Sequence, residues 1–94
     1  MSTIRKGKKM KEIKYVITDP EGIHARPANL LVKKAAGYAC KVTIGKDGRE
    51  VDAKRIMGVM SLAAKKDQEI TIKCDGEGEE TAITELEAFL KENL

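Results

Sequence analysis

The chain has 94 residues, of which 41% are hydrophobic and 3% aromatic, so it has the size of one domain with a thin, aliphatic core. No apolar run is long enough to span a membrane, and the basic start of the chain lacks the apolar stretch of a secretory signal. We therefore expect a cytoplasmic protein.

The basic residues are concentrated at the start of the chain. Residues 1–11 hold five lysines and arginines and no acid, whereas residues 12–94 hold 13 basic and 15 acidic residues. We expect residues 1–10 to be a basic, flexible leader and residues 11–94 to be the folded domain. The leader can be a tether for nucleic acid or a membrane, but it has no aromatic residue, which favours a disordered leader or a translation start upstream of Met10.

Cys40 and Cys74 are far apart in the sequence and form no Cys-x-x-Cys pair. This spacing does not predict a metal site. Both residues fall in or beside predicted strands, and a cytosolic chain favours two reduced, structural thiols. A disulfide between them is the less favoured alternative.

The first half of the chain begins with an alternating pattern that predicts a strand over residues 12–17. Asp19-Pro20-Glu21-Gly22 then supplies the residues of a turn. Apolar residues follow helical spacing from Ala25 to about Ala36, and Gly37 is a suitable helix stop.

The middle of the chain predicts a hairpin and a short helix. Residues 40–44 and residues 50–52 form two strand patterns, and Lys46-Asp47-Gly48 lies between them as a hairpin turn. Residues 55–63 are apolar and methionine-rich over a length that favours a helix.

The last third predicts a fourth strand around Ile70 and Ile72 after a turn at Lys66-Asp67-Gln68. A loop at residues 75–78 leads to a helix from about Glu79, with acids in its first turn. The order is β-α-β-β-α-β-α, and its short loops favour an antiparallel sheet with the helices on one face, an α+β fold.

The most informative segment is Gly22-Ile23-His24-Ala25-Arg26-Pro27-Ala28, which contains the only histidine. Proline is tolerated in the first helical turn because its missing N–H would have no partner there. His24 is therefore predicted at or just before a helix N-terminus, where free amides and the helix dipole favour an anion. Arg26 can add a guanidinium to the oxygens of a phosphate.

A neutral imidazole is a nucleophile at physiological pH, and a phosphoryl group on nitrogen remains labile enough to move on. The amides and Arg26 would stabilise the charge during transfer. No further catalytic residues are evident in the sequence near His24, so the pattern predicts a phosphoryl carrier. It leaves open whether the protein also turns over as an enzyme. The alternative is structural: His24 caps a helix and Arg26 is a solvated charge.

The same segment resembles the active-centre signature of the HPr family of the sugar phosphotransferase system. A second segment, Ile56-Met57-Gly58-Val59-Met60-Ser61-Leu62, is similar to that family's downstream motif. The resemblance covers about residues 12–92. It implies an open-faced β-sandwich, a four-stranded antiparallel sheet with three helices on one side.

The resemblance also implies the chemistry and the partners. Phosphorylated enzyme I would donate to Nδ1 of His24, and phospho-His24 would donate to a IIA domain of a sugar permease. The Ala25 and Arg26 amides would bind the phosphate, with no metal and no cofactor. We expect a monomer, because such a carrier presents one face to each partner in turn.

An exposed, flexible methionine surface beside a phosphate site suits docking to several partners. The alternative is that these apolar side chains are all core. The residues expected at the docking surface are Ile23, Pro27, Asn29, Ile56, Met57 and Met60. Arg26, Lys33, Lys54 and Arg55 are predicted to surround the site and attract an acidic partner.

One departure from the family limits its regulation. In many Gram-positive relatives a serine before the second motif is phosphorylated by a kinase, but Arg55 occupies that position here. Arginine is also a weak N-cap, so Asp52 is expected to serve that end of the helix. Ser61 is a poor substitute because it lies inside the helical pattern.

Two other functions remain as alternatives. One is an HPr-like regulatory protein that docks on partners without transport-linked phosphotransfer, although such relatives can lose the histidine that is present here. The other is a nucleic-acid binder that uses the leader; the acidic body and the few aromatic residues disfavour it.

Overall fold

The computed structural model describes residues 10–94, so residues 1–9 of the predicted leader lie outside the described part. The element order agrees with the predicted β-α-β-β-α-β-α. The elements are β1 (Lys11–Val16), α2 (Ala25–Ala36), β2 (Lys41–Lys46), β3 (Arg49–Asp52), α3 (Ile56–Ser61), β4 (Glu69–Asp75) and α4 (Glu79–Asn93).

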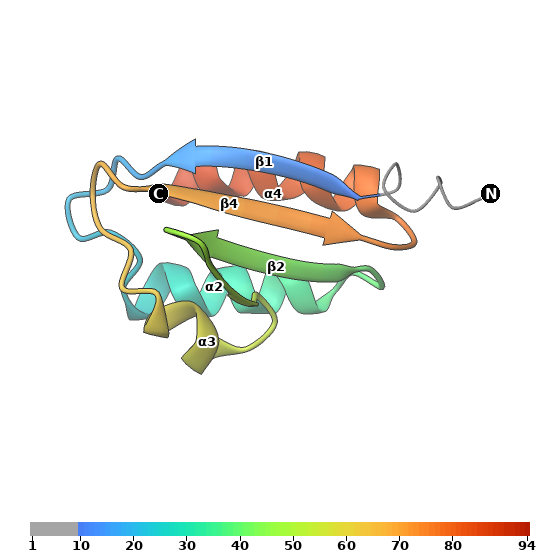
Figure 1. Ribbon diagram of the computed structural model, residues 1–94, viewed down its shortest axis with the longest axis horizontal. Coiled ribbons are helices and arrows are strands. Elements are labelled where there is room, and N and C mark those ends of the chain that lie inside the picture. The colour runs from blue at the N-terminus through green and yellow to red at the C-terminus, as the bar shows by residue number, and fades with distance from the viewer. Residues whose placement is uncertain (1–9) are drawn as a thin grey trace.

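The four strands form one antiparallel sheet in the order β1-β4-β2-β3. Helices α2 and α4 cover one face of this sheet, and α3 lies beside α2 at its lower edge (Figure 1). The architecture is the open-faced sandwich that the family resemblance implies. Because the β1–β4 pairing places β1 and β4 side by side, the turns at 17–24 and 62–68 lie at the same end of the sheet (Figure 1).

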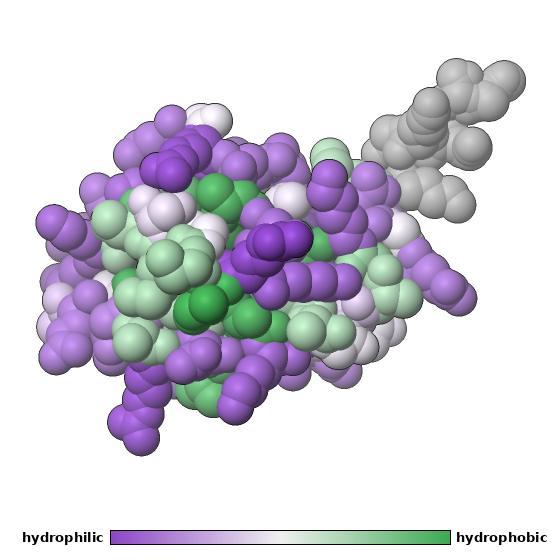
Figure 2. Space-filling view, turned by 90° about the horizontal axis from the view of Figure 1, so that it is seen from below, coloured by the Kyte–Doolittle hydropathy of each residue, from purple (hydrophilic) through white to green (hydrophobic). Residues whose placement is uncertain are grey.

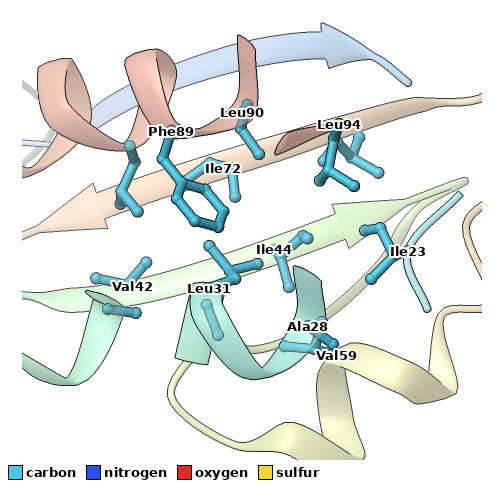
Figure 3. Close-up of a cluster of buried hydrophobic side chains, with 14 of the residues drawn as sticks. Ile23, Ala28, Leu31, Val42, Ile44, Val59, Ile72, Phe89, Leu90 and Leu94 are labelled. Atoms are coloured by element: carbon cyan, nitrogen blue, oxygen red, sulfur yellow. The ribbon is translucent and has the colours of Figure 1, made fainter. Parts of the chain in front are cut away.

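The core fills the space between the sheet and the helices. Side chains of β2 and β4 face those of α2 and α4 across this layer, with Val59 closing it from α3 (Figure 3). Buried residues alternate along β4, as a strand with one covered face requires. The sheet thereby provides a rigid base for both helices.

The hairpin forms as the sequence predicts. β2 and β3 pair antiparallel up to Lys46 and Arg49. Asp47 and Gly48 between them have φ angles of 52° and 83°, the left-handed values of a two-residue hairpin turn.

The boundaries of several predicted elements move by one or two residues. Ile17 lies beyond the end of β1 and is buried, because its N–H and carbonyl bind Gln68 and Asp67 of the opposite turn. The helix predicted over 55–63 ends at Ser61. Ala63 has a φ of 50°, which a right-handed helix does not allow.

Candidate functional site

His24 lies at the start of α2, as Pro27 predicted. It is the N-cap residue, with extended backbone angles of φ −107° and ψ −173°, and its carbonyl accepts the first helical hydrogen bond from the Ala28 N–H at 3.0 Å. The imidazole side chain is 38% exposed. The ring is therefore outside the core and open to a partner.

The first turn of α2 offers two backbone donors. Within the described residues, no side chain caps this helix and no acidic residue occupies its first turn. The Ala25 and Arg26 N–H groups belong to the orphan donors of a helix start, and Pro27 has no N–H. Together with the positive end of the helix dipole, they form a place for an anion next to the imidazole.

The orientation of the imidazole favours one tautomer. Nε2 of His24 lies 3.6 Å from Oε1 of Glu21, too far for a strong hydrogen bond but close enough for electrostatic attraction. A carboxylate on that side favours a proton on Nε2. The lone pair that remains for a nucleophile is then on Nδ1.

The turn before His24 is held by backbone contacts that only glycine permits. Gly22 has a φ of 68°, and a Cβ there would lie 2.4 Å from the Ala64 carbonyl oxygen. The next N–H, of Ile23, donates to that same oxygen at 2.9 Å. Gly22 and Ile23 thus rest on the 62–68 turn and fix where α2 begins.

A second anchor comes from Leu94. Its carbonyl oxygen accepts hydrogen bonds from the Thr18 and Asp19 N–H groups at 2.6 and 2.7 Å and from the Thr18 hydroxyl at 2.9 Å. Asp19 in turn accepts the Glu21 N–H at 2.8 Å. The approach to His24 is therefore fixed from both sides.

A shallow hollow of about 550 Å³ lies in front of the imidazole. Its lining consists of Asp19, Pro20, Glu21, His24, Arg26, Pro27, Leu30 and Asn93. Sequence reasoning did not identify Leu30 and Asn93 as site residues. Leu30 follows Arg26 by one helical turn, a spacing that predicts its place, whereas Asn93 arrives through the packing of α4 and leaves no sequence signal.

The expected docking residues separate by burial. Ile23 and Pro27 are buried, Ile23 in the core and Pro27 in the first turn of α2, so little of either side chain is exposed to a partner. Ile56 is half-buried against the core. Asn29 is exposed on α2.

Three exposed apolar side chains remain on the helices next to the site. Met57 is 78% exposed, Leu30 44% and Met60 39%. The face that carries α2 and α3 has apolar side chains at its centre and hydrophilic ones around them (Figure 2). We call Leu30, Met57 and Met60 the methionine patch.

The predicted ring of cations is incomplete. Arg26, Lys33 and Arg55 are exposed. Lys54 is different, because its Nζ donates to the Tyr38 carbonyl at 2.8 Å, beyond the C-terminal end of α2. Lys54 is thus held at the opposite end of the helix from His24 and does not surround the site.

The start of α3 also differs from the expectation. Arg55 is its N-cap and makes no capping hydrogen bond with its side chain. Asp52 does not cap the helix; its carboxylate accepts the Lys54 N–H at 2.8 Å and lies 3.7 Å from Nε of Arg55. Asp52 therefore orders the turn that precedes the helix.

Cys40 and Cys74 are free and buried, as predicted for structural thiols. Burial raises the pKa of the Cys74 thiol to about 12, with a further contribution from Cys40. A protonated, buried thiol is a poor nucleophile and a poor metal ligand. Among residues 10–94, no cluster of three or more histidine, cysteine and acidic side chains could hold a metal ion, and no helix is long and apolar enough to cross a membrane.

The fold and this helix start define a small protein with an open place for an anion beside an exposed imidazole. Residues 11–92 match the sequence profile of the family described as "PTS HPr component phosphorylation site". The chain belongs to this HPr family of the phosphotransferase system.

Relatives with known names agree. The chain is 40% identical over 85 residues to the phosphocarrier protein HPr of Mycoplasma genitalium, an alignment that covers 89% of this chain and 97% of the relative. A solved structure of a mycoplasma histidine-containing phosphocarrier protein is 37% identical with a TM-score of 0.82, covering 84% of this chain and 90% of that one. The HPr of Bacillus anthracis str. Ames is 38% identical with a TM-score of 0.81, covering 86% and 96%.

These matches show that the chain is a phosphocarrier of the phosphotransferase system. They do not favour the alternative of a purely regulatory relative. A carrier in this system interacts with the system's enzymes. Which residues carry and bind the phosphoryl group, and which partners dock, follow as proposals from the geometry.

Proposed function

We propose that His24 is the phosphoryl carrier, that phosphorylated enzyme I is its donor, and that a IIA domain of a sugar permease is its acceptor. The observation that carries this proposal is the open start of α2, where an exposed imidazole lies beside two free amides and Arg26, with no acid in the turn. An imidazole alone is common; an imidazole next to an unoccupied anion site is the arrangement that phosphoryl transfer needs.

The transfer itself is a displacement at phosphorus. The Nδ1 lone pair of His24 forms the new N–P bond while the bond from phosphorus to the donor breaks, and the donor keeps that electron pair. The proton on Nε2 stays in place, favoured by Glu21 at 3.6 Å. The Ala25 and Arg26 amides and the Arg26 guanidinium stabilise the phosphoryl oxygens, and the reverse displacement passes the group to the acceptor.

Incubation with enzyme I and radiolabelled phosphoenolpyruvate tests the assignment. We expect one acid-labile, base-stable label per chain, because a phosphoryl group on imidazole nitrogen is lost in acid. His24→Ala is a complete control, since the chain has no other histidine. Label that persists in His24→Ala, or that survives acid, would overturn the proposal.

Docking is proposed to occur on the methionine patch, with Asn29 and Ile56 at its edge. The patch is apolar, its methionine side chains are flexible on a helix that is held in place, and Leu30 lines the hollow beside His24. One surface can therefore fit two different partners in turn. Met57→Ser and Met60→Ser should raise the KM of enzyme I for the carrier and leave kcat unchanged. Val16, an exposed apolar residue on β1 with an exposure between those of Met60 and Met57, is the matched control, and an equal effect of Val16→Ser would contradict this surface.

Arg55 is proposed to favour docking in place of a regulated serine. Its guanidinium is 80% exposed at the start of α3, where a phosphoserine would carry the opposite charge. We expect transfer rates to fall from wild type through Arg55→Ser to Arg55→Asp. Equal rates for the three proteins would show that the charge at this position has no role.

The chain is proposed to act as a monomer in the cytoplasm, which fits a carrier that presents the same face to each partner. Light scattering of the purified protein tests the first part. A stable dimer that buries the methionine patch would exclude simultaneous docking on that surface.

A further inference from the structure

Helix α3 carries two of the three residues of the methionine patch, yet its own sequence stabilises it poorly. It has only six residues, no capping hydrogen bond from the Arg55 side chain, no acid in its first turn and no base in its last turn. Gly58 in its middle lowers its helix propensity further. A helix this short does not form without tertiary contacts, so its position depends on what holds it from outside.

Arg49 of the β2–β3 hairpin contacts the C-terminal end of α3. One guanidinium nitrogen, Nη1, lies 3.2 Å from the Ser61 carbonyl oxygen, and Nη2 lies 3.1 Å from Ser61 Oγ. The Ser61 hydroxyl donates onward to the Gly58 carbonyl at 2.6 Å. The guanidinium thus supplies donors and positive charge where a helix has unpaired carbonyls and the negative end of its dipole.

The hairpin that presents Arg49 is itself fixed. Arg49 pairs with Lys46 in the strand register across a tight turn. Lys46 Nζ lies 3.3 Å from Oε1 of Gln68 and 3.5 Å from the Ala63 carbonyl. Side chains of the hairpin therefore reach both the last residue of α3 and the segment after it.

Residues 61–64 also contact the turn that leads to His24, because the Ala64 carbonyl accepts the Ile23 N–H at 2.9 Å. Residues 61–64 lie between the hairpin, which holds them, and the turn that leads to His24. The end of α3 and the start of α2 are thus connected through a few backbone contacts.

We infer that Arg49 is a positioning residue for phosphoryl transfer, which holds the last turn of α3 so that the methionine patch presents a fixed surface beside His24. The inference rests on the proposed function of His24 and adds a residue that touches neither the phosphoryl group nor the imidazole. Loss of the Arg49 contact loosens the turn that contains Met60. It weakens docking and leaves the chemistry at His24 unchanged.

The test compares Arg49→Gln, Arg49→Lys and wild type in steady-state transfer from enzyme I. We expect Arg49→Gln to raise the KM for the carrier about fivefold at unchanged kcat, the effect of one exposed hydrogen bond of ordinary strength. Arg49→Lys keeps the charge but cannot bind both Ser61 oxygens as a fork, so it should rescue part of the loss. Hydrogen exchange of the hydrogen-bonded amides in residues 59–62 should be faster in Arg49→Gln.

Two controls separate positioning from charge and from folding. Lys41→Gln removes one positive charge from the exposed first residue of β2. Ser61→Ala removes one of the two oxygens, and combining it with Arg49→Gln should add little if both act through one contact.

Several outcomes would overturn the inference: an unchanged KM in Arg49→Gln, an equal rise in Lys41→Gln, a fall in kcat, or unchanged exchange in α3. Exchange is measured without enzyme I, so it reports on Arg49 independently of transfer. If wild type takes no label on His24, the proposed function fails. If wild type is labelled and Arg49→Gln is kinetically identical to it, only the positioning role fails.

Discussion

The starts of α2 and α4 present the same physical problem with opposite solutions. Both helices expose amides and a positive dipole end at their first turn. In α4 the protein's own acids fill this place: Glu79 and Glu80 lie in the first turn, and the buried Glu79 carboxylate accepts the Gly76 N–H at 2.9 Å. In α2 the first turn has no acid, and neither helix has a side-chain cap at its N-cap residue.

The difference supports the proposal that the start of α2 is kept open for a ligand. A helix with a purely structural role gains stability from a carboxylate at its start. At α2 that stabilisation is absent, and a histidine and an arginine lie there instead. The proposed function of α2 rests on the backbone amides that no acid of the protein occupies. Variants that change the acids and glycines at the two helix starts test this comparison.

The largest effect is expected at the glycines that lead into the two helices. Gly22→Ala places a Cβ 2.4 Å from a backbone oxygen at a φ of 68°, whereas at Gly78, with a φ of 78°, a Cβ meets nothing within 4 Å. Gly22→Ala should lower the free energy of unfolding by about 3 kcal/mol, from strain plus overpacking, and Gly78→Ala by about 1 kcal/mol, from strain alone. Urea unfolding measures both, and equal losses would show that the close approach at Gly22 does not matter.

The next effect comes from giving α2 the acid that α4 has. In Ala25→Glu a carboxylate about 8 Å from the phosphoryl group opposes its charge by about 2 kcal/mol at an effective dielectric of about 20, which slows transfer about thirtyfold. The same carboxylate should raise the stability of the fold by about 0.5 kcal/mol through the helix dipole.

Ala25→Gln is the matched control for Ala25→Glu, because it has nearly the same shape without the charge. Stopped-flow transfer from phosphorylated enzyme I and thermal unfolding give the two readouts. A variant that is both less stable and slower would indicate a distorted helix, and one with a wild-type transfer rate would contradict the anion site.

A smaller effect is expected when α4 loses its acid. Glu79→Ala removes the hydrogen bond to the Gly76 N–H and should cost about 1 kcal/mol of unfolding free energy, as for other lost hydrogen bonds. Glu80→Ala is the control: Glu80 is exposed and forms a surface ion pair with Lys11 at 3.4 Å, so its loss should be close to neutral. Neither variant should change phosphoryl transfer, and slower transfer in Glu79→Ala would mean that α4 contributes to the site.

The sequence alone correctly predicted the order of the helices and strands and the position of His24 at the start of a helix. Alternation in β4, the Asp47-Gly48 turn and Pro27 in the first helical turn are local signals, and each gave the right structure. The burial of Ile23 was not predictable in this way. It depends on the 62–68 turn, which packs against Gly22 from about 40 residues away along the chain.

The same limit applies to the residues that sequence reasoning missed. Asn93 reaches the hollow beside His24 only because α4 packs across the sheet, and Arg49 meets Ser61 only because a hairpin lies beside α3. Lys54 was misplaced for the converse reason: it is near Arg55 in sequence but binds Tyr38 beyond the far end of α2. Contacts between different helices and strands leave no periodic pattern in the sequence. The sequence therefore predicts the residues within one element of the site better than the residues that other elements bring to it.

The smallest effect concerns the approach of a partner. Arg26 and Arg55 are exposed cations on the face with the methionine patch, and long-range attraction by such charges affects mainly the association rate. Charge reversal at both, Arg26→Glu with Arg55→Glu, should slow association with enzyme I several-fold more at low salt than at high salt. At high salt a screening length of about 3 Å removes the long-range attraction. The part of the loss that persists at high salt reports the direct role of Arg26 at the phosphate. If the loss is the same at both ionic strengths, Arg26 acts only through direct contact with the phosphate, and these two arginines exert no long-range attraction on the partner. The attraction of the site for anions would then come from the start of α2 itself.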